Sequence, residues 1–253
     1  WLPRIAGGEC VIGVGLSEYV GAREDAGIEF SNGKLSGRSL FLIDGKNADA
    51  YLLANKSGEL FLVEASAPGI EVIELTTVDK TRTSIELILK NVDADLLSGS
   101  DNKSIIEKVL DAGRIMLAAD TVGAAQVMLD KSVAYSLERK QFGRLIGSFQ
   151  AVKHMCAEMA AELEPCHSMI WHAAHCFDNV PEEARLMACQ TKAHISEVGQ
   201  QVSKTATEVH GGMGFTDELG LHYWFKRIGL NKQLLGSPEL IREEAGKLQG
   251  FDQ

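Results

Sequence analysis

The hydrophobic and polar positions of this chain follow two different periods, one in its first hundred residues and another in the remainder. The first part carries short apolar or alternating runs, which are typical of β-strands. Turn-forming steps such as Asp44-Gly45 and Pro68-Gly69 separate these runs. We therefore expect a closed or sandwiched antiparallel β domain over residues 1–100. The runs that predict strands cover residues 10–16, 39–43, 50–54, 60–63 and 84–89.

From residue 102 onward the period changes to that of helices. Ser104 followed by Glu107 is a capping-box signature, and it predicts a first helix that runs to about residue 135. Small residues let a second helix approach closely, so the small-residue stretch of this helix predicts a buried central position. That stretch comprises Ala118, Ala119, Gly123, Ala124 and Ala125.

Four more helices are predicted after this one. The second covers about residues 147–176, and Pro165 should kink it or break it in two. The third begins at Pro181 and runs to about residue 210, a shorter one follows Thr216, and the last opens at Ser237. Residues 101–253 are thus expected to form a helical bundle, and the whole chain an α+β protein.

Composition narrows the functional classes. The net charge of -10 argues against a nucleic-acid partner, which would favour a clustered basic face. No apolar run approaches the roughly 20 residues of a membrane span, and nothing resembles a signal peptide. The five cysteines lack the Cys-x-x-Cys spacing. We therefore expect a cytoplasmic protein with reduced thiols.

One group of residues has the residue types of a metal site. His172, His175 and Cys176 lie close together in sequence. No second pair of ligands with metal-site spacing accompanies them, so we expect packing or helix-surface roles and no metal.

Two segments between helices carry candidate chemistry. The step Arg139-x-Gln141-Phe142-Gly143 joins the first and second helices, and Gln150 follows one turn into the second. An arginine supplies a fixed fork of donors for a pyrophosphate. A tight interhelical turn would explain the glycine but not the phenylalanine.

The second segment, residues 208–215, reads EVHGGMGF and joins the third and fourth helices. Its glycines allow a ligand to approach the backbone closely, and their amides can face phosphate oxygens. Taken alone, this segment too is compatible with a simple turn.

Together the segments are more specific. A β-rich domain that leads into a bundle bearing Tyr-x-x-x-Arg-x-Gln-Phe-Gly and then His-Gly-Gly-x-Gly-Phe-Thr resembles the acyl-CoA dehydrogenases, most strongly over residues 104–248. That family has an N-terminal helical domain, a middle β domain and a C-terminal four-helix bundle. This sequence matches the last two, so we expect the first to be missing from its front. The resemblance implies FAD as cofactor, an acyl-CoA substrate from fatty acid or steroid degradation, and an electron-transfer flavoprotein as a further partner.

The resemblance also implies roles for individual residues. Arg139 and Phe142 match residues that reach across a dimer interface to a neighbour's FAD, and Gln141 belongs to the same motif. The other residues matched to the cofactor are Gln150, Glu208, Gly211 and Gly212, where Glu208 replaces a glutamine. The CoA-side contacts of the family correspond to Asp111 and Arg114.

The chain departs from the family at the catalytic base. In the family a carboxylate removes the α-proton of the thioester while a hydride leaves the β-carbon for the flavin. The two known positions of that carboxylate are occupied here by Leu235 and Gly113. Flavin-lining segments of the β domain also differ, at Ser17-Glu18-Tyr19 and at Phe41-Leu42-Ile43. We therefore assign no catalytic residue to this chain.

Three hypotheses follow. The first is the subunit without a base in a hetero-oligomeric acyl-CoA dehydrogenase, whose sister chain supplies base and flavin pocket. The second is a homomeric enzyme that takes its base from Asp111, Glu239 or Glu243. The third is a non-catalytic relative that binds CoA esters or another protein.

Overall fold

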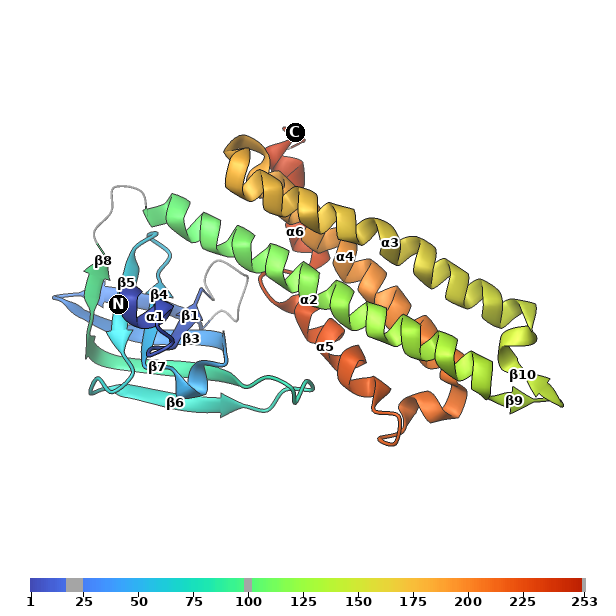
Figure 1. Ribbon diagram of the computed structural model, residues 1–253. Coiled ribbons are helices and arrows are strands. Elements are labelled where there is room, and N and C mark those ends of the chain that lie inside the picture. Colours follow the sequence, from blue (N-terminus) through green and yellow to red (C-terminus); the bar gives the residue numbers. More distant parts are fainter. Residues whose placement is uncertain (17–24, 98–101, 252–253) are drawn as a thin grey trace. The chain divides into compact units, whose positions relative to one another are not determined.

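The computed structural model describes residues 1–16, 25–97 and 102–251, and it divides into two units, Trp1–Lys108 and Val109–Gln253. The boundary lies inside the long helix α2 (Asn102–Glu138), which Figure 1 shows in green. The predicted α+β fold, a β domain followed by a helical bundle, is confirmed.

The first unit is built from two four-stranded sheets, with strand orders β1-β4-β5-β8 and β2-β3-β7-β6. The edge strand β1 pairs with β4 in parallel, and the other pairings in these two sheets are antiparallel. A short helix, α1 (Leu2–Ala6), comes before them. The strands are β1 (Ile12–Gly15), β2 (Gly27–Ser31), β3 (Lys34–Ile43), β4 (Ala50–Ala54), β5 (Leu60–Glu64), β6 (Ile70–Leu75), β7 (Ser84–Asp93) and β8 (Asp95–Leu97).

The two sheets share one hydrophobic core, as expected of a sandwich. Leu42 and Leu87 come from one sheet, Leu53 and Phe61 come from the other, and none of these side chains is accessible to solvent. Because these strands place apolar residues on the shared face, burial of that face stabilises the pairing of the sheets.

Local geometry in β3 places the Phe41-Leu42-Ile43 segment, one of the two β-domain segments that depart from the resemblance. Two residues of β3 lie opposite one residue of β7 between the pairs Ser39–Leu87 and Leu42–Ile85, which defines a β-bulge. The bulge holds Phe41 at a φ of 58° and leaves its ring half exposed. Leu42 is fully buried, so the Phe41-Leu42-Ile43 segment is part of the sheet's own packing. The Ser17-Glu18-Tyr19 segment lies outside the described residues.

The second unit is a bundle of long helices (Figure 1). A hairpin of two short strands, β9 (Lys140–Gln141) and β10 (Arg144–Leu145), follows α2. Of the predicted starts, Ser237 is confirmed as the N-cap of the last helix, where its Oγ accepts a hydrogen bond from the Leu240 amide. The remaining helices are α3 (Gln150–Asn179), α4 (Pro181–His210), α5 (Leu221–Gln233) and α6 (Pro238–Leu248).

The core of this unit draws on α2, α3, α4 and α5, with α6 packing on α4. Ala118 and Ala125 of α2 are buried, which confirms the central position predicted for this helix. A Cβ atom on Gly199 of α4 would lie 2.4 Å from Thr121 Cγ2, so a glycine is required where α4 crosses α2. Gly123, by contrast, faces open space.

Of the kink or break predicted at Pro165, the break is wrong, because α3 continues through this residue from Gln150 to Asn179, and the kink stays a prediction. Pro165 and Ala161, the residue whose carbonyl loses its helical hydrogen bond, are both exposed. Water can satisfy that carbonyl, so the helix need not end. Among the described residues, no helix combines the length and apolar character needed to cross a lipid bilayer.

Candidate functional site

Arg139 to Leu145 form a tight hairpin at the end of α2. Gln141 pairs with Arg144, and the two residues between them, Phe142 and Gly143, have positive φ angles of 55° and 77°. That is the backbone of a two-residue type I′ turn, which favours asparagine or glycine at its first position. The hairpin is anchored at its base, where the Ile146 amide donates to the Arg139 carbonyl at 2.8 Å.

Phe142 is the most unusual residue of this hairpin. Its side chain is 93% exposed, and its backbone lies in a region that bulky residues rarely adopt. Its ring makes an edge contact with Phe149 at 6.1 Å, and the guanidinium of Arg144 lies 3.8 Å from the centre of the Phe149 ring. Folding of the chain therefore does not require a phenylalanine here, which favours a role in binding.

The glycine-rich segment forms the end of α4 and the turn that follows it. Gly211 ends the helix with a φ of 58°, a conformation that favours glycine. A 3₁₀ turn over Gly211–Phe215 comes next, in which a Cβ atom on Gly214 would lie 2.7 Å from the Thr207 carbonyl oxygen. Gly211 and Gly212 are exposed and face open space, so a ligand can reach their backbone.

Two aromatic rings bring the hairpin and the glycine-rich segment to the same end of the bundle. The Tyr135 ring stacks on the His210 ring with centroids 4.6 Å apart. The Arg139 amide also donates a hydrogen bond to the Tyr135 carbonyl, so Tyr135 is tied to the hairpin. His210 directly precedes Gly211 of the glycine-rich segment. His210 is fixed by its Nδ1, which donates to the Ala206 carbonyl at 2.7 Å. Both rings belong to the two sequence motifs, but the motifs did not predict that the rings would stack.

Two further predicted cofactor residues are exposed near these motifs in the sequence. Gln150, the first residue of α3, contacts His154 Nε2 at 3.4 Å. Glu208 lies in the last turn of α4 with its side chain exposed. The Gln141 side chain donates to the Lys140 carbonyl.

Leu235 and Gly113, which match the two base positions of the resemblance and were expected to carry no base, share one location in space. Leu235 lies in the turn between α5 and α6, whereas Gly113 lies on α2. A Cβ atom on Gly113 would be 2.4 Å from Leu235 Cδ1, so the leucine occupies the space that a Gly113 side chain would enter. Leu235 has a φ of 56°, a strained value for a leucine. An apolar group thus fills the place where either residue could have presented a carboxylate.

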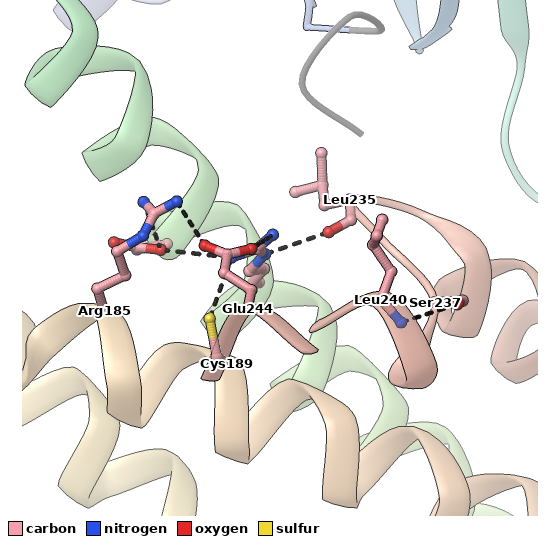
Figure 2. Close-up of polar contacts among 8 residues, drawn as sticks. Arg185, Cys189, Leu235, Ser237, Leu240 and Glu244 are labelled. Carbon is pink, nitrogen blue, oxygen red and sulfur yellow. Dashed lines mark hydrogen bonds and ion pairs between the residues drawn. The ribbon is translucent and has the colours of Figure 1, made fainter. Parts of the chain in front are cut away.

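A partly buried ion network fixes the backbone of that turn (Figure 2). Arg114 Nε donates to the Leu235 carbonyl at 3.1 Å, and its terminal nitrogens donate to the Glu244 carboxylate at 3.2 and 2.8 Å and to Cys189 Sγ at 3.2 Å. Arg185 pairs with the same Glu244 carboxylate. Asp111 lies 3.7 Å from both guanidinium groups.

The network has defined charge states. Burial opposes the charge of Glu244, but the hydrogen bonds and charges of Arg114 and Arg185 outweigh it and hold the pKa of Glu244 below its usual range. Burial raises the pKa of the Cys189 thiol to about 12, so this sulfur accepts from Arg114 as a neutral thiol. Asp111 and Arg114, the predicted substrate residues, are only 4% and 2% exposed. Arg114 therefore positions the Leu235 carbonyl and Asp111 lies beside its guanidinium, while substrate contact by either residue stays a prediction.

Sequence reasoning missed Lys192, which lies on α4 three residues after Cys189. Its side chain is fully buried, and its Nζ donates to Ser196 Oγ at 3.0 Å and to the Lys232 carbonyl at 3.4 Å. Burial, together with the positive charges of Arg114 and Lys232, lowers the pKa of Lys192 to about 7. The sequence did carry one indication of this site: Lys192 occurs on a helix face whose other residues are small or apolar, where a lysine is unusual.

Comparison with known proteins agrees with this fold. The family description "Acyl-CoA dehydrogenase, C-terminal domain" matches residues 103–247. This β-sandwich and helical bundle therefore belong to a chain of the acyl-CoA dehydrogenase family, as the sequence motifs predicted.

Particular relatives define the likeness further. The chain is 30% identical to the probable acyl-CoA dehydrogenase YngJ of Bacillus subtilis over 95% of its own length and 69% of the relative's. It is 29% identical to the caffeyl-CoA reductase-Etf complex subunit CarC of Acetobacterium woodii, over 73% of this chain and 52% of the relative. The solved structure of a Tcur3481-Tcur3483 steroid ACAD variant superposes with a TM-score of 0.86 at 27% identity, over 99% of this chain and 70% of the other. The chain thus spans between half and seven tenths of these relatives.

Proposed function

We propose that this chain is a subunit of an FAD-dependent acyl-CoA dehydrogenase that lacks the catalytic base and works with a sister chain. The observation that carries the proposal is the Leu235 side chain lying over Gly113, where either position could have supplied the base. At the other candidate site, the exposed Phe142 and the open glycines remain available to a ligand. A chain that keeps the exposed hairpin and the open glycines but has no carboxylate at Leu235 or Gly113 assists a cofactor without removing a proton.

The residues fit FAD at the hairpin end of the bundle. Arg139 would bind the pyrophosphate, Phe142 would cover an apolar face of the dinucleotide, and the Gly211 and Gly212 backbone would accommodate the phosphates. FAD, when bound, accepts the hydride that leaves the β-carbon of the acyl group. The sister chain would supply the carboxylate that removes the α-proton, since loss of a general base typically costs about 10²–10⁴ in rate. Two similar proteins carry names that indicate assemblies, the CarC complex subunit and the Tcur3481-Tcur3483 steroid enzyme.

The alternative of a homomeric enzyme with a relocated base has less support. Glu239 and Glu243 are exposed, and hydrogen bonds from Ser237 and Lys247, respectively, lower the pKa values of these carboxylates. Asp111 is buried between two guanidinium groups. A base for a weakly acidic proton needs a raised pKa in a dry pocket; Glu239 and Glu243 meet neither condition, and Asp111 is already engaged by two guanidinium groups.

Purification of the chain alone and together with its sister chain tests the proposal. Native mass spectrometry should show bound FAD in the mixed complex only. An activity assay should likewise detect acyl-CoA dehydrogenase turnover in the mixed complex only. Full flavin loading and turnover by the isolated chain would establish the homomeric alternative. A stable complex that never contains flavin would instead support a non-catalytic binding protein.

A further inference from the structure

The corner between α3 and α4 brings together a histidine, a cysteine and a glutamate. Only Val180 separates the end of α3 from the start of α4 (Figure 1). His172 and Cys176 are four residues apart on α3 and so lie on one face of it, while Glu183 belongs to the first turn of α4. One ligand atom from each of these three side chains lies within 4.8 Å of the other two.

The distances fit a tetrahedral cation. Cys176 Sγ lies 3.7 Å from His172 Nε2 and 4.0 Å from Glu183 Oε2. Zinc bonds of about 2.3 Å to sulfur and about 2.0–2.2 Å to nitrogen or oxygen imply ligand separations of about 3.6 Å in a tetrahedral site. The two separations from Cys176 Sγ therefore lie close to those of a tetrahedral site, and side-chain rotations that bring His172 and Glu183, now within 4.8 Å, closer together would complete the geometry.

Burial and charge also suit a cation at this corner. Cys176 is only 1% exposed, which restricts its rotamers, whereas His172 and Glu183 are exposed and admit an ion from solvent. Burial, followed by the negative charges of Glu183 and Glu182, raises the pKa of the Cys176 thiol. The Glu183 and Glu182 carboxylates disfavour a free thiolate at Cys176. The same negative charges attract a divalent cation, and a bound cation would stabilise the thiolate beside them.

We propose that His172, Cys176 and Glu183 bind a zinc ion, with water in the fourth position. On binding, the Cys176 thiol releases its proton to solvent and coordinates as thiolate. From the sequence we expected no metal, because the apparent group was His172, His175 and Cys176 and a ligand was lacking. The structure supplies that ligand from the next helix, and the ion would join the end of α3 to the start of α4.

The test is zinc titration of the tag-free full chain, in the assembly in which it is purified. The variants are His172→Ala, Cys176→Ser and Glu183→Gln, and the matched controls are His175→Ala and Glu182→Gln from the same corner. We expect one zinc per chain, a loss of affinity of at least about tenfold in the three variants, wild-type affinity in His175→Ala, and no more than a small electrostatic loss in Glu182→Gln, which removes a nearby charge but no ligand. Zinc should raise the melting temperature of the wild type and controls only, because it binds the folded state.

Cobalt provides a spectroscopic readout of the thiolate. Bound Co²⁺ should show a sulfur-to-metal charge-transfer band that disappears in Cys176→Ser. If Cys176→Ser does not fold, the zinc affinities of His172→Ala and Glu183→Gln provide the test, because these two side chains are exposed and their substitution removes no buried group. Equal loss in variants and controls, unchanged affinity in His172→Ala and Glu183→Gln, or a cobalt complex without the charge-transfer band would overturn the assignment.

Discussion

Lys192 shows how a single buried charge shapes the stability of the bundle. Its hydrogen-bond acceptors, Ser196 Oγ and the Lys232 carbonyl, are neutral, and the charges that act on it from Arg114 and Lys232 are positive. Its ammonium form is therefore disfavoured in the folded protein. In the unfolded chain the same amine titrates near 10.5.

The substitution Lys192→Met should raise the free energy of unfolding near neutral pH by about 1–3 kcal/mol. Below pH 7 the lysine is charged in both states, so the cost of its burial is fully present. Between about pH 7 and pH 10.5 the unfolded state binds the extra proton, so the wild type gains stability as pH rises. The difference between variant and wild type should thus be largest at about pH 6 and shrink towards about pH 9.

Urea unfolding at several pH values measures this difference. Lys204→Met, an exposed position on the same helix, is the control and should show no such dependence. A stability difference for Lys192→Met that stays constant across this range would contradict the depressed pKa.

Leu235 and Gly113 allow a test of their shared location. An alanine at Gly113 would gain helix propensity, typically about 1 kcal/mol, but its Cβ would meet Leu235 Cδ1. We expect Gly113→Ala to be more favourable in a Leu235→Ala background than in the wild type, by about 1 kcal/mol. A double-mutant cycle of unfolding free energies measures this coupling, and strict additivity would show that the two side chains do not compete.

At the scale of elements, the sequence predicted those parts whose burial follows a clear period. β4 was predicted at its observed bounds, and the start of α4 at Pro181 was correct because a proline and acidic residues mark it. The half-exposed strands β2 and β6 were missed, since only part of each faces the core. The hairpin of β9 and β10 is too short for any period to reveal it.

The candidate site was predictable as two motifs but not as an arrangement. Tyr135 and His210 lie far apart in sequence, and their stacking depends on where α2 and α4 end. The ion network of Arg114, Arg185 and Glu244 likewise joins three helices. No local pattern encodes such pairings, because they depend on tertiary packing.

The hairpin itself separates folding from function. Asparagine adopts positive φ more readily than phenylalanine and is preferred before glycine in a type I′ turn. Phe142→Asn should therefore leave the melting temperature unchanged or raise it slightly, while FAD binding by the mixed complex falls. Thermal unfolding and flavin content, measured on one preparation, give both values.

Trp171→Ala is a suitable control for this variant, since Trp171 is another largely exposed aromatic residue of the bundle, 76% accessible. It should change neither stability nor flavin content. A fall in melting temperature with Phe142→Asn, or unaltered flavin binding, would show that the ring serves the fold of this chain.

At the scale of the whole molecule, the proposed division of work places proton removal in a sister chain, while this chain contributes to binding the FAD. The chain itself has the Leu235 side chain against Gly113 and an exposed hairpin that carries Phe142. If a sister chain holds the flavin pocket, Arg139 of this chain acts on a cofactor that reacts elsewhere. Arg139→Ala should then reduce FAD affinity of the mixed complex by about tenfold or more, as expected for a lost hydrogen bond to a charged group.

The same substitution should leave the assembly intact, because the Arg139 side chain is exposed and only its backbone is part of the hairpin base. Added FAD should restore turnover of Arg139→Ala to near the wild-type rate, since the base and the flavin pocket would lie in the sister chain. Flavin titration, native mass spectrometry and activity at saturating FAD together separate weak cofactor binding from lost chemistry. Turnover that stays low in saturating FAD would place Arg139 in the reaction itself, and the division of work between two chains would then be incorrect.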